Sequence, residues 1–304
     1  LGRGGKLRGD RTDRRGHVGR TQTVARWRQD GGQRQDAEPS YYVMRHSFPM
    51  GGKNMVRVGL IASVGLEDYE TRQVLPHEFT QAPAIQDRVW LMESLSANIS
   101  PIMSIYRDAE GELDRMYQQV MQGEPEFDST DGSGSATALW RISDPGVQSQ
   151  ISEFFSSRPI YLADGHHRYE AARQYQLDRH AEDPSAKAAN LAHNFVMMTL
   201  ISFDDPGLVV LGYHRTLNGV PADKLANIKA KLDELFDAEA ISGSSDALIE
   251  QVDRLGAKRR ALASVDSGGA KMLTLKDSAV KSDCGPDWPP WRSGPRRGGP
   301  VGTA

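Results

Sequence analysis

The 304-residue sequence predicts a mixed α+β fold with largely antiparallel sheets and interspersed helices. Segments rich in β-branched and aromatic residues occur in pairs that are separated by turn signals, which indicates hairpins. Segments with helical spacing of apolar residues stand between these pairs. Strands and helices do not alternate one by one along the chain, as they would in a parallel α/β fold.

The elements follow from local patterns. The first two strands flank a Gly-Gly turn, and the first long helix is predicted where apolar residues recur every three or four positions, from Ile85 to Leu95. The expected strands are 41–48, 56–64, 71–75, 100–106, 139–142, 160–163, a hairpin of 193–203 with 208–213, and a pair at 261–265 and 271–275. The expected helices are 83–97, 111–121, 145–155, one directly after Gly165, 221–236 and 246–255.

The composition predicts one folded domain between two unstructured ends. Residues 1–23 are rich in Gly and Arg, and 281–304 interleave Pro with Gly and Arg, so neither end offers enough apolar surface to bury. We therefore expect the domain at 24–280. A Ser/Gly-rich stretch at 128–135 is expected to be a mobile loop or an internal boundary.

The charge and the cysteine content limit the partners. A net charge of −3 supplies no basic excess, which argues against a nucleic-acid partner. The single cysteine, Cys284, excludes an internal disulfide framework and a four-thiolate metal cluster. No apolar stretch approaches the roughly 18 residues of a membrane helix, and the N-terminus lacks the apolar core of a signal peptide. We predict a cytoplasmic protein with a small-molecule substrate and no membrane partner; the oligomeric state stays open.

One stretch is the strongest candidate for chemistry. An apolar strand pattern at 160–163 leads into a tight turn and then into good helix formers. The turn and the first helical positions read Asp164-Gly165-His166-His167-Arg168. The first N–H groups of a helix lack intrahelical partners and lie at the positive end of its dipole, so they favour an anion. Arginine and histidine side chains add donors there. We predict a phosphate site.

A structural interpretation explains the same residues. Asp164 would be the N-cap, Gly165 would supply a positive φ, and the cations would be solvated surface residues. We favour the functional interpretation because three adjacent cation-capable residues repel one another unless an anion compensates their charge.

Two further polar pairs follow predicted strands. His77-Glu78 resembles the start of a zinc-protease motif, but Gln81 stands where the second histidine is required, so that class is excluded. The pair could still supply a general base or bind a cation, or be an ordinary exposed loop pair. His214-Arg215 is a second cation pair, with a solvated hairpin end as its structural alternative. A metal site would require convergence of His77, His166, His167 and His214.

Several motifs together resemble the bacterial and archaeal family called domain of unknown function 1015. The most specific is Asp-Gly-His-His-Arg-Tyr-Glu at 164–170, and the resemblance covers about residues 24–277. The other matching motifs are Pro39-Ser40-Tyr41-Tyr42-Val43, Arg57-Val58-Gly59-Leu60, His77-Glu78-Phe79-Thr80, Asp87-Arg88, Pro101-Ile102, and Asn194-Phe195-Val196 through His214-Arg215. The resemblance implies no established reaction.

The same resemblance implies further motifs at both ends, of Pro-Pro-Tyr-Asp type before the domain and of Pro-Lys-Ser-Thr and Tyr-Pro-Lys type after it. The Arg/Gly-rich head and the Pro/Gly-rich tail stand in their place. We therefore keep an inactive, truncated fragment as one expectation for this chain.

The turn also resembles the phosphate-binding element of the ParB/sulfiredoxin superfamily, which includes nucleotide-dependent free-serine kinases and nucleotide-hydrolysing partition proteins. This resemblance implies that Gly165 and the following amides hold nucleotide phosphates together with His166, His167 and Arg168. It also implies that Asp164 or Glu78 serves as the base or as a Mg²⁺ ligand. His77 joins these catalytic candidates. Arg88, His214 and Arg215 join the candidate phosphate-binding residues.

The sequence-based hypothesis is thus a nucleotide-dependent small-molecule phosphotransferase or a nucleotide hydrolase that uses ATP, ADP or another nucleotide with Mg²⁺. The alternative is a non-catalytic nucleotide-sensing regulatory protein that uses the same turn. A carboxylate close to Arg168 favours the enzyme, because phosphoryl transfer needs a base or a metal ligand beside the phosphate groups.

Overall fold

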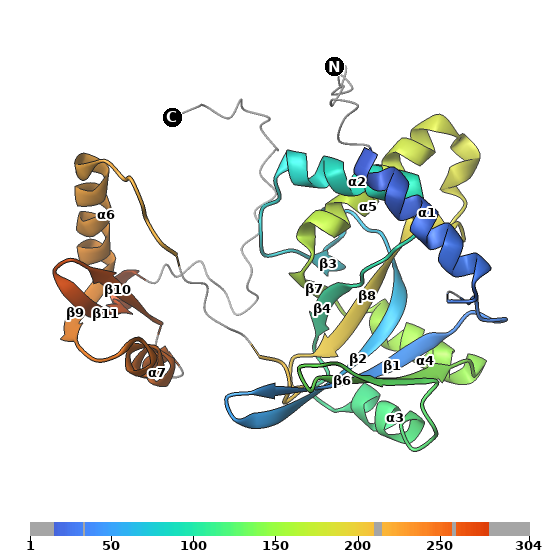
Figure 1. Cartoon of the computed structure of the whole chain (residues 1–304), viewed down its shortest axis with the longest axis horizontal. Coiled ribbons are helices and arrows are strands. Elements are labelled where there is room, and N and C mark those ends of the chain that lie inside the picture. Colours follow the sequence, from blue (N-terminus) through green and yellow to red (C-terminus); the bar gives the residue numbers. More distant parts are fainter. Residues whose placement is uncertain (1–14, 33, 210–214, 257–259, 280–304) are drawn as a thin grey trace. The chain divides into compact units, whose positions relative to one another are not determined.

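The computed structural model describes residues 15–32, 34–209, 215–256 and 260–279. The chain divides into two compact units, Leu1–Val210 and Leu211–Ala304 (Figure 1). Each unit has its own β-sheet, which has eight strands in the first unit and three in the second. Helices accompany both sheets, so the predicted α+β class is confirmed.

The large sheet is mixed but mainly antiparallel, as predicted. Its strand order is β3-β7-β4-β8-β2-β1-β6-β5, and only the pairs β3–β7 and β4–β8 are parallel. The strands are β1 (Tyr41–Met50), β2 (Lys53–Gly65), β3 (Val74–Leu75), β4 (Ile102–Tyr106), β5 (Phe127–Thr130), β6 (Ala136–Ile142), β7 (Ile160–Asp164) and β8 (Phe195–Ser202).

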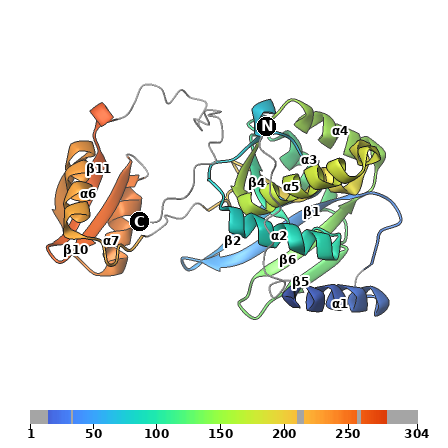
Figure 2. The same cartoon turned by 90° about the horizontal axis from the view of Figure 1, so that it is seen from above.

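Helices gather on two sides of these strands. In Figure 1, α1, α2 and α5 lie above the strands in the view, and α3 and α4 lie below them. The α-helices are α1 (Arg15–Gln29), α2 (Ala82–Leu95), α3 (Glu112–Val120), α4 (Pro145–Ser156) and α5 (His166–Glu182). Short 3₁₀ turns occur at η1 (Tyr69–Thr71), η2 (Pro184–Lys187) and η3 (Ala192–Asn194). Helix α2 packs along α5, and both lie beside one another in Figure 2 as well.

The core of the first unit fixes where α5 begins. Strand β4 buries every second side chain, Ile102, Ser104 and Tyr106, as expected for a strand with one face in the core. Tyr169 and Ala172 of α5 are fully buried in the same cluster. Because these residues lie in the first two turns of α5, burial of apolar surface holds the N-terminus of the helix against the sheet.

The second unit is a small α+β unit. Its sheet has the order β10-β11-β9, and both strand pairs are antiparallel. Its elements are α6 (Ala222–Leu235), β9 (Phe236–Ile241), α7 (Ser245–Gly256), β10 (Ala261–Asp266), β11 (Gly269–Leu275) and the 3₁₀ turn η4 (Asp277–Ala279). Met272 and Leu273 of the central strand are its buried hydrophobic residues in the described part of the chain.

A division of the chain falls within the domain expected at 24–280. The division lies between 210 and 211, not at the Ser/Gly-rich stretch 128–135. That stretch forms most of β5 and the turn to β6, within the first unit. Asp131 accepts hydrogen bonds from the N–H groups of Ser133 and Ser135 and so closes this hairpin turn. The same composition is typical of turns and of linkers, and here it builds a turn.

Helix α1 begins inside 1–23, which the sequence predicted to be unstructured. Arg, Gln and Ala favour helix, and they become frequent from residue 20 onward. The predicted tail, 281–304, lies outside the described residues, and so does most of the strand predicted at 208–213.

Two shorter stretches also differ from prediction. The strand expected at 71–75 is reduced to β3, because a 3₁₀ turn ends at Thr71 and Arg72 adopts a left-handed conformation with φ of 60°. The helix expected at 221–236 ends at Leu235, and the next residues form β9, which the sequence did not predict. Strand β9 consists largely of Asp, Ala and Glu, which are depleted in strands, and it pairs with β11 along its whole length.

Candidate functional site

The turn between β7 and α5 is the strand–turn–helix element that the sequence predicted. Strand β7 ends at Asp164, Gly165 has a φ of +99°, and α5 begins at His166. A positive φ is strained for residues with a Cβ. A Cβ at Gly165 would also lie 2.8 Å from a guanidinium nitrogen of Arg168. Gly165 is therefore required by the backbone and by the arginine that folds over it.

The Arg168 side chain ties this turn to the segment before β4. Its Nη1 donates to Ser100 Oγ at 2.7 Å, to Pro101 O at 2.6 Å and to Ser100 O at 3.3 Å. Its Nη2 donates to Asp164 Oδ2 at 2.7 Å. Asp164 is thus the ion-pair partner of Arg168, and the N-cap position belongs to Gly165.

His166 and His167 hold the two ends of loop 77–81, which joins β3 to α2. Nε2 of His166 accepts a hydrogen bond from the His77 N–H at 3.2 Å. Nε2 of His167 accepts one from the Gln81 N–H at 3.1 Å. With its ends anchored on the first turn of α5, the loop presents its middle residues beside that turn.

Tyr169 continues this series of anchors. Its hydroxyl donates to Glu67 O at 2.8 Å and accepts from the Glu67 N–H at 3.0 Å. The side chains at 166–169 therefore hold four separate backbone positions or segments around the start of α5. Sequence reasoning assigned three of these side chains to a ligand and did not identify Ser100, Pro101, Gln81 or Glu67 as their partners.

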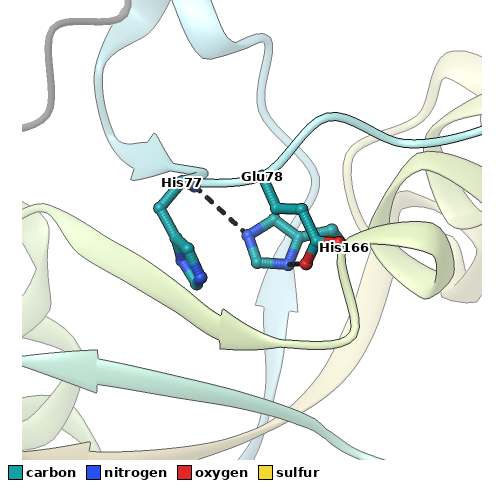
Figure 3. A group of neighbouring side chains, drawn as sticks. All are labelled: His77, Glu78 and His166. Atoms are coloured by element: carbon teal, nitrogen blue, oxygen red, sulfur yellow. Dashed lines mark hydrogen bonds and ion pairs between the residues drawn. The ribbon is translucent and has the colours of Figure 1, made fainter. Parts of the chain in front are cut away.

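His77, Glu78 and His166 lie together at this point (Figure 3). The His77 and His166 rings meet edge to face, with centroids 4.5 Å apart and planes at 88°. Nδ1 of His77 donates to Leu162 O at 2.7 Å. Oε2 of Glu78 lies 3.8 Å from Nδ1 of His166. The His166 side chain is 2% exposed and that of Glu78 is 62% exposed, so a solvent-accessible carboxylate faces a buried imidazole.

The hydrogen bonds determine the protonation state of His166. Because Nε2 accepts the His77 N–H, the proton of the neutral ring lies on Nδ1 and faces Glu78. Burial, followed by the neighbouring His77, lowers the pKa of His166 below its ordinary value, although the Glu78 and Asp164 carboxylates act in the opposite direction. At neutral pH His166 is thus an uncharged donor directed at the Glu78 carboxylate.

The same three residues could be considered as a metal centre, since each places one potential ligand atom within 4.8 Å of the others. His77 fits this role, because its Nδ1–H bonds a carbonyl and its Nε2 lone pair is available. His166 does not fit, because a metal-bound histidine normally donates its second N–H, whereas here that nitrogen accepts one. We therefore assign no transition-metal centre to this set. The four-histidine site also fails at His167, whose Nε2 is bonded to Gln81.

The remaining candidates are Arg88, His214 and Arg215. Arg88 is an exposed residue of α2. His214 lies outside the described residues, and Arg215 is exposed and belongs to the second unit. Within the first unit, the structure thus brings together the candidates from 77–78 and 164–168.

The fold and the site define an α+β protein whose main sheet carries a strand–turn–helix element with two carboxylates at the helix N-terminus. The chain belongs to the family described as Protein of unknown function (DUF1015), whose sequence model matches residues 8–290. No curated protein and no solved structure matches the chain. Among the residues that the structure describes, no helix combines the length and the apolarity needed to cross a membrane.

Proposed function

We propose that the protein is a nucleotide-dependent phosphotransferase or nucleotide hydrolase that acts on a small molecule at the N-terminus of α5. One observation supports this proposal above the others: two exposed carboxylates lie at the first turn of that helix. Asp164 is 2.7 Å from Arg168, and Glu78 is 3.8 Å from His166. An anion-attracting helix terminus beside a carboxylate is the minimum that phosphoryl transfer needs.

In this proposal the backbone holds the phosphate groups. The hydrogen bonds of α5 begin with the N–H groups of Arg168 and Tyr169, which both bond Gly165 O. The N–H groups of the two preceding residues, His166 and His167, have no intrahelical acceptor, as in any α-helix. They lie at the positive end of a helix of 17 residues.

Glu78 is the proposed base or Mg²⁺ ligand. Its carboxylate is exposed, and the Nδ1–H of His166 is directed at it. A carboxylate oxygen suits Mg²⁺, which prefers oxygen ligands and keeps several waters, and it also suits the proton of an attacking hydroxyl. Asp164 is the second candidate, but its ion pair with Arg168 already uses one oxygen. When bound, Mg²⁺ would neutralise phosphate charge.

A non-catalytic nucleotide-binding role is the second candidate function. It is favoured by the hydrogen bonds of Arg168, His166 and His167 to the protein's own backbone, which leave few side chains for catalysis. The enzymatic and the non-catalytic function would use the same nucleotide-binding site, but only the enzyme would convert the bound nucleotide.

The proposal is tested with the full chain by calorimetry with ATP, ADP and CTP, each with and without Mg²⁺. Phosphate release and transfer to hydroxyl-bearing acceptors are then followed by ³¹P NMR. The variant Glu78→Gln removes the charge at an exposed position, and Glu124→Gln, an exposed loop residue, is its matched control. We expect saturable binding by all three proteins and turnover that is lost only in Glu78→Gln.

The outcomes separate the alternatives. Binding without turnover by the wild-type protein would support the non-catalytic function. Turnover that is unchanged in Glu78→Gln would exclude Glu78 as base or metal ligand. No binding of any nucleotide by the folded wild-type chain would refute both functions.

A further inference from the structure

Asparagine is followed by glycine once in the sequence, at Asn218-Gly219. Both residues are exposed and lie outside helices and strands, in the described stretch 215–221 before α6. Among the residues that the structure describes, neither the Asn218 side chain nor the Gly219 N–H has a hydrogen-bond partner. No described residue therefore holds either group in place.

These two groups can react with each other. Attack of the Gly219 nitrogen on Cγ, the side-chain carbonyl carbon of Asn218, closes a five-membered ring. A Cβ on the following residue hinders this approach, and glycine has none. A Cβ built at Gly219 would meet no atom within 4 Å, so the space beside this residue is open as well.

Other asparagines of the chain lack one of these conditions. In helices and strands the backbone N–H groups are engaged in hydrogen bonds and the dihedral angles are fixed, which keeps the nitrogen away from Cγ. Asn54 lies in β2 and Asn227 in α6. Asn98 is exposed and outside helices and strands, but the β-branched Ile99 follows it. Asn218 combines an open backbone with a following glycine.

We infer that Asn218 is a site of spontaneous deamidation through a cyclic succinimide. The Gly219 nitrogen loses its proton and bonds to Cγ of Asn218, and the side-chain amide nitrogen leaves as ammonia. Water then opens the ring at one of its two carbonyl carbons. Opening at Cγ gives aspartate, and opening at the main-chain carbonyl carbon gives isoaspartate, whose backbone runs through Cγ.

The reaction changes the segment between the two sheets. Either product adds one negative charge to the chain, and isoaspartate also lengthens the main chain by one carbon. Isoaspartate is in addition the group that isoaspartyl methyltransferases recognise, so the modified chain becomes a substrate for that class of repair enzyme. The inference does not depend on the proposed nucleotide site, whose residues belong to the first unit.

The test follows the full wild-type chain, Asn218→Gln and Gly219→Ala during incubation at physiological temperature in mildly alkaline buffer. Peptide mass spectrometry locates the gain of about 1 Da that accompanies replacement of an amide by an acid. An isoaspartyl methyltransferase with a labelled methyl donor detects isoaspartate. A synthetic peptide of residues 215–221 gives the rate without folded structure, and Asn98 is the matched exposed control within the same chain.

We expect deamidation at Asn218 to be at least about 10-fold faster than at Asn98 and within about 3-fold of the peptide rate. Gly219→Ala should slow the reaction, and Asn218→Gln should abolish it. A folded chain that stays unmodified while the peptide reacts would overturn the inference, because the structure would then protect the pair. Equal rates at Asn98 and Asn218 would exclude the role of Gly219. Aspartate formed without isoaspartate would exclude the succinimide.

Discussion

Arg168 gives all four of its hydrogen bonds to the protein itself, three to Ser100 and Pro101 and one to Asp164. At the scale of single residues, the first turn of α5 therefore uses its polar side chains as anchors. His166, His167 and Tyr169 do the same for Glu67 and for loop 77–81. Beside them the Glu78 carboxylate is 62% exposed and faces the buried His166 ring.

Replacing Arg168 tests this anchoring role. The planar guanidinium spans several acceptors, whereas the compact ammonium of lysine cannot reach them all. We expect Arg168→Ala and Arg168→Lys each to lower the free energy of unfolding by about 1.5–3 kcal/mol, the range for hydrogen bonds to charged groups. Urea unfolding measures this loss. Arg88→Ala, at an exposed position of α2, is the control and should change the free energy of unfolding by less than about 0.5 kcal/mol. Wild-type stability in Arg168→Lys would contradict the anchoring role.

His166 should make stability depend on pH. Its pKa in the folded protein is lowered by burial, so the unfolded chain takes up a proton first as the pH falls. The stabilisation by neutral His166 is present above the ordinary histidine pKa and is lost as the pH decreases from there toward the folded pKa. Urea unfolding of wild type and His166→Gln at pH 7.5, 6.5 and 5.5 measures this loss. The pKa of His46 is lowered as well and acts in the same direction in both proteins, so the difference between them isolates His166. If the free energies of unfolding of the two proteins depend on pH in the same way, His166 does not cause the loss.

The sequence identified the residues of the site but not their partners. A strand, a turn and a helix start follow from local patterns at 160–170, and a glycine with positive φ follows from the turn. His166 and His167 are hydrogen-bonded to backbone N–H groups almost 90 positions earlier in the chain, and a local sequence pattern cannot predict such a contact.

At the scale of elements, the turn after β8 packs closely against the backbone of β2. Asp205 accepts hydrogen bonds from the N–H groups of Val58 on β2 and of Gly207 within the turn. A Cβ at Gly207 would lie 2.2 Å from the carbonyl oxygen of Val56. The turn at 204–207 therefore lies directly on β2, and glycine is needed for the approach of the two backbones.

Gly207→Ala should therefore be strongly destabilising. Backbone atoms must move to admit the methyl group, and we expect a loss of about 2 kcal/mol or more in the free energy of unfolding. Gly132→Ala is the matched control, because a Cβ there meets no atom within 4 Å. Chemical unfolding of both variants measures the difference. If the two variants lose the same stability, the close packing of this turn on β2 is wrong.

The elements that the sequence predicted well are those with strong local periodicity. The alternating strands β4 and β6 and the helices α2 and α4 appear close to their predicted positions. Strand β9 was missed because its residues become a strand by pairing with β11, more than 25 positions later. The 128–135 stretch, expected as a mobile loop or an internal boundary, holds the end of β5 and the turn to β6, because Ser, Gly and Asp occur in linkers and in hairpin turns alike.

At the scale of the whole molecule, the chain carries two sheets that share no strand pairing among the described residues. The described parts of the segment between them, 203–209 and 215–221, contain no helix or strand. The sequence predicted turns in this segment but did not predict that the chain divides into two units there. Both units contain strands and helices of ordinary composition. The two units are distinguished by strand pairing, which occurs within each sheet.

Limited trypsin digestion should separate the two units. Between Ser202 and Ala222 the sequence contains one Lys or Arg residue at which trypsin can cut, Arg215, and it is exposed and outside helices and strands. Proteases cut such segments first, because paired strands must open before they fit a protease site. Mass spectrometry should find a fragment ending at Arg215 that contains β1 to β8 and a fragment beginning at Thr216 that contains β9 to β11. Arg215→Gln should abolish both fragments while leaving cuts near the chain ends unchanged. Two outcomes would show that the two sheets do not form separate units. One is cleavage within β1 to β8 before cleavage at Arg215. The other is a 41–275 fragment that stays intact after the chain ends have been removed.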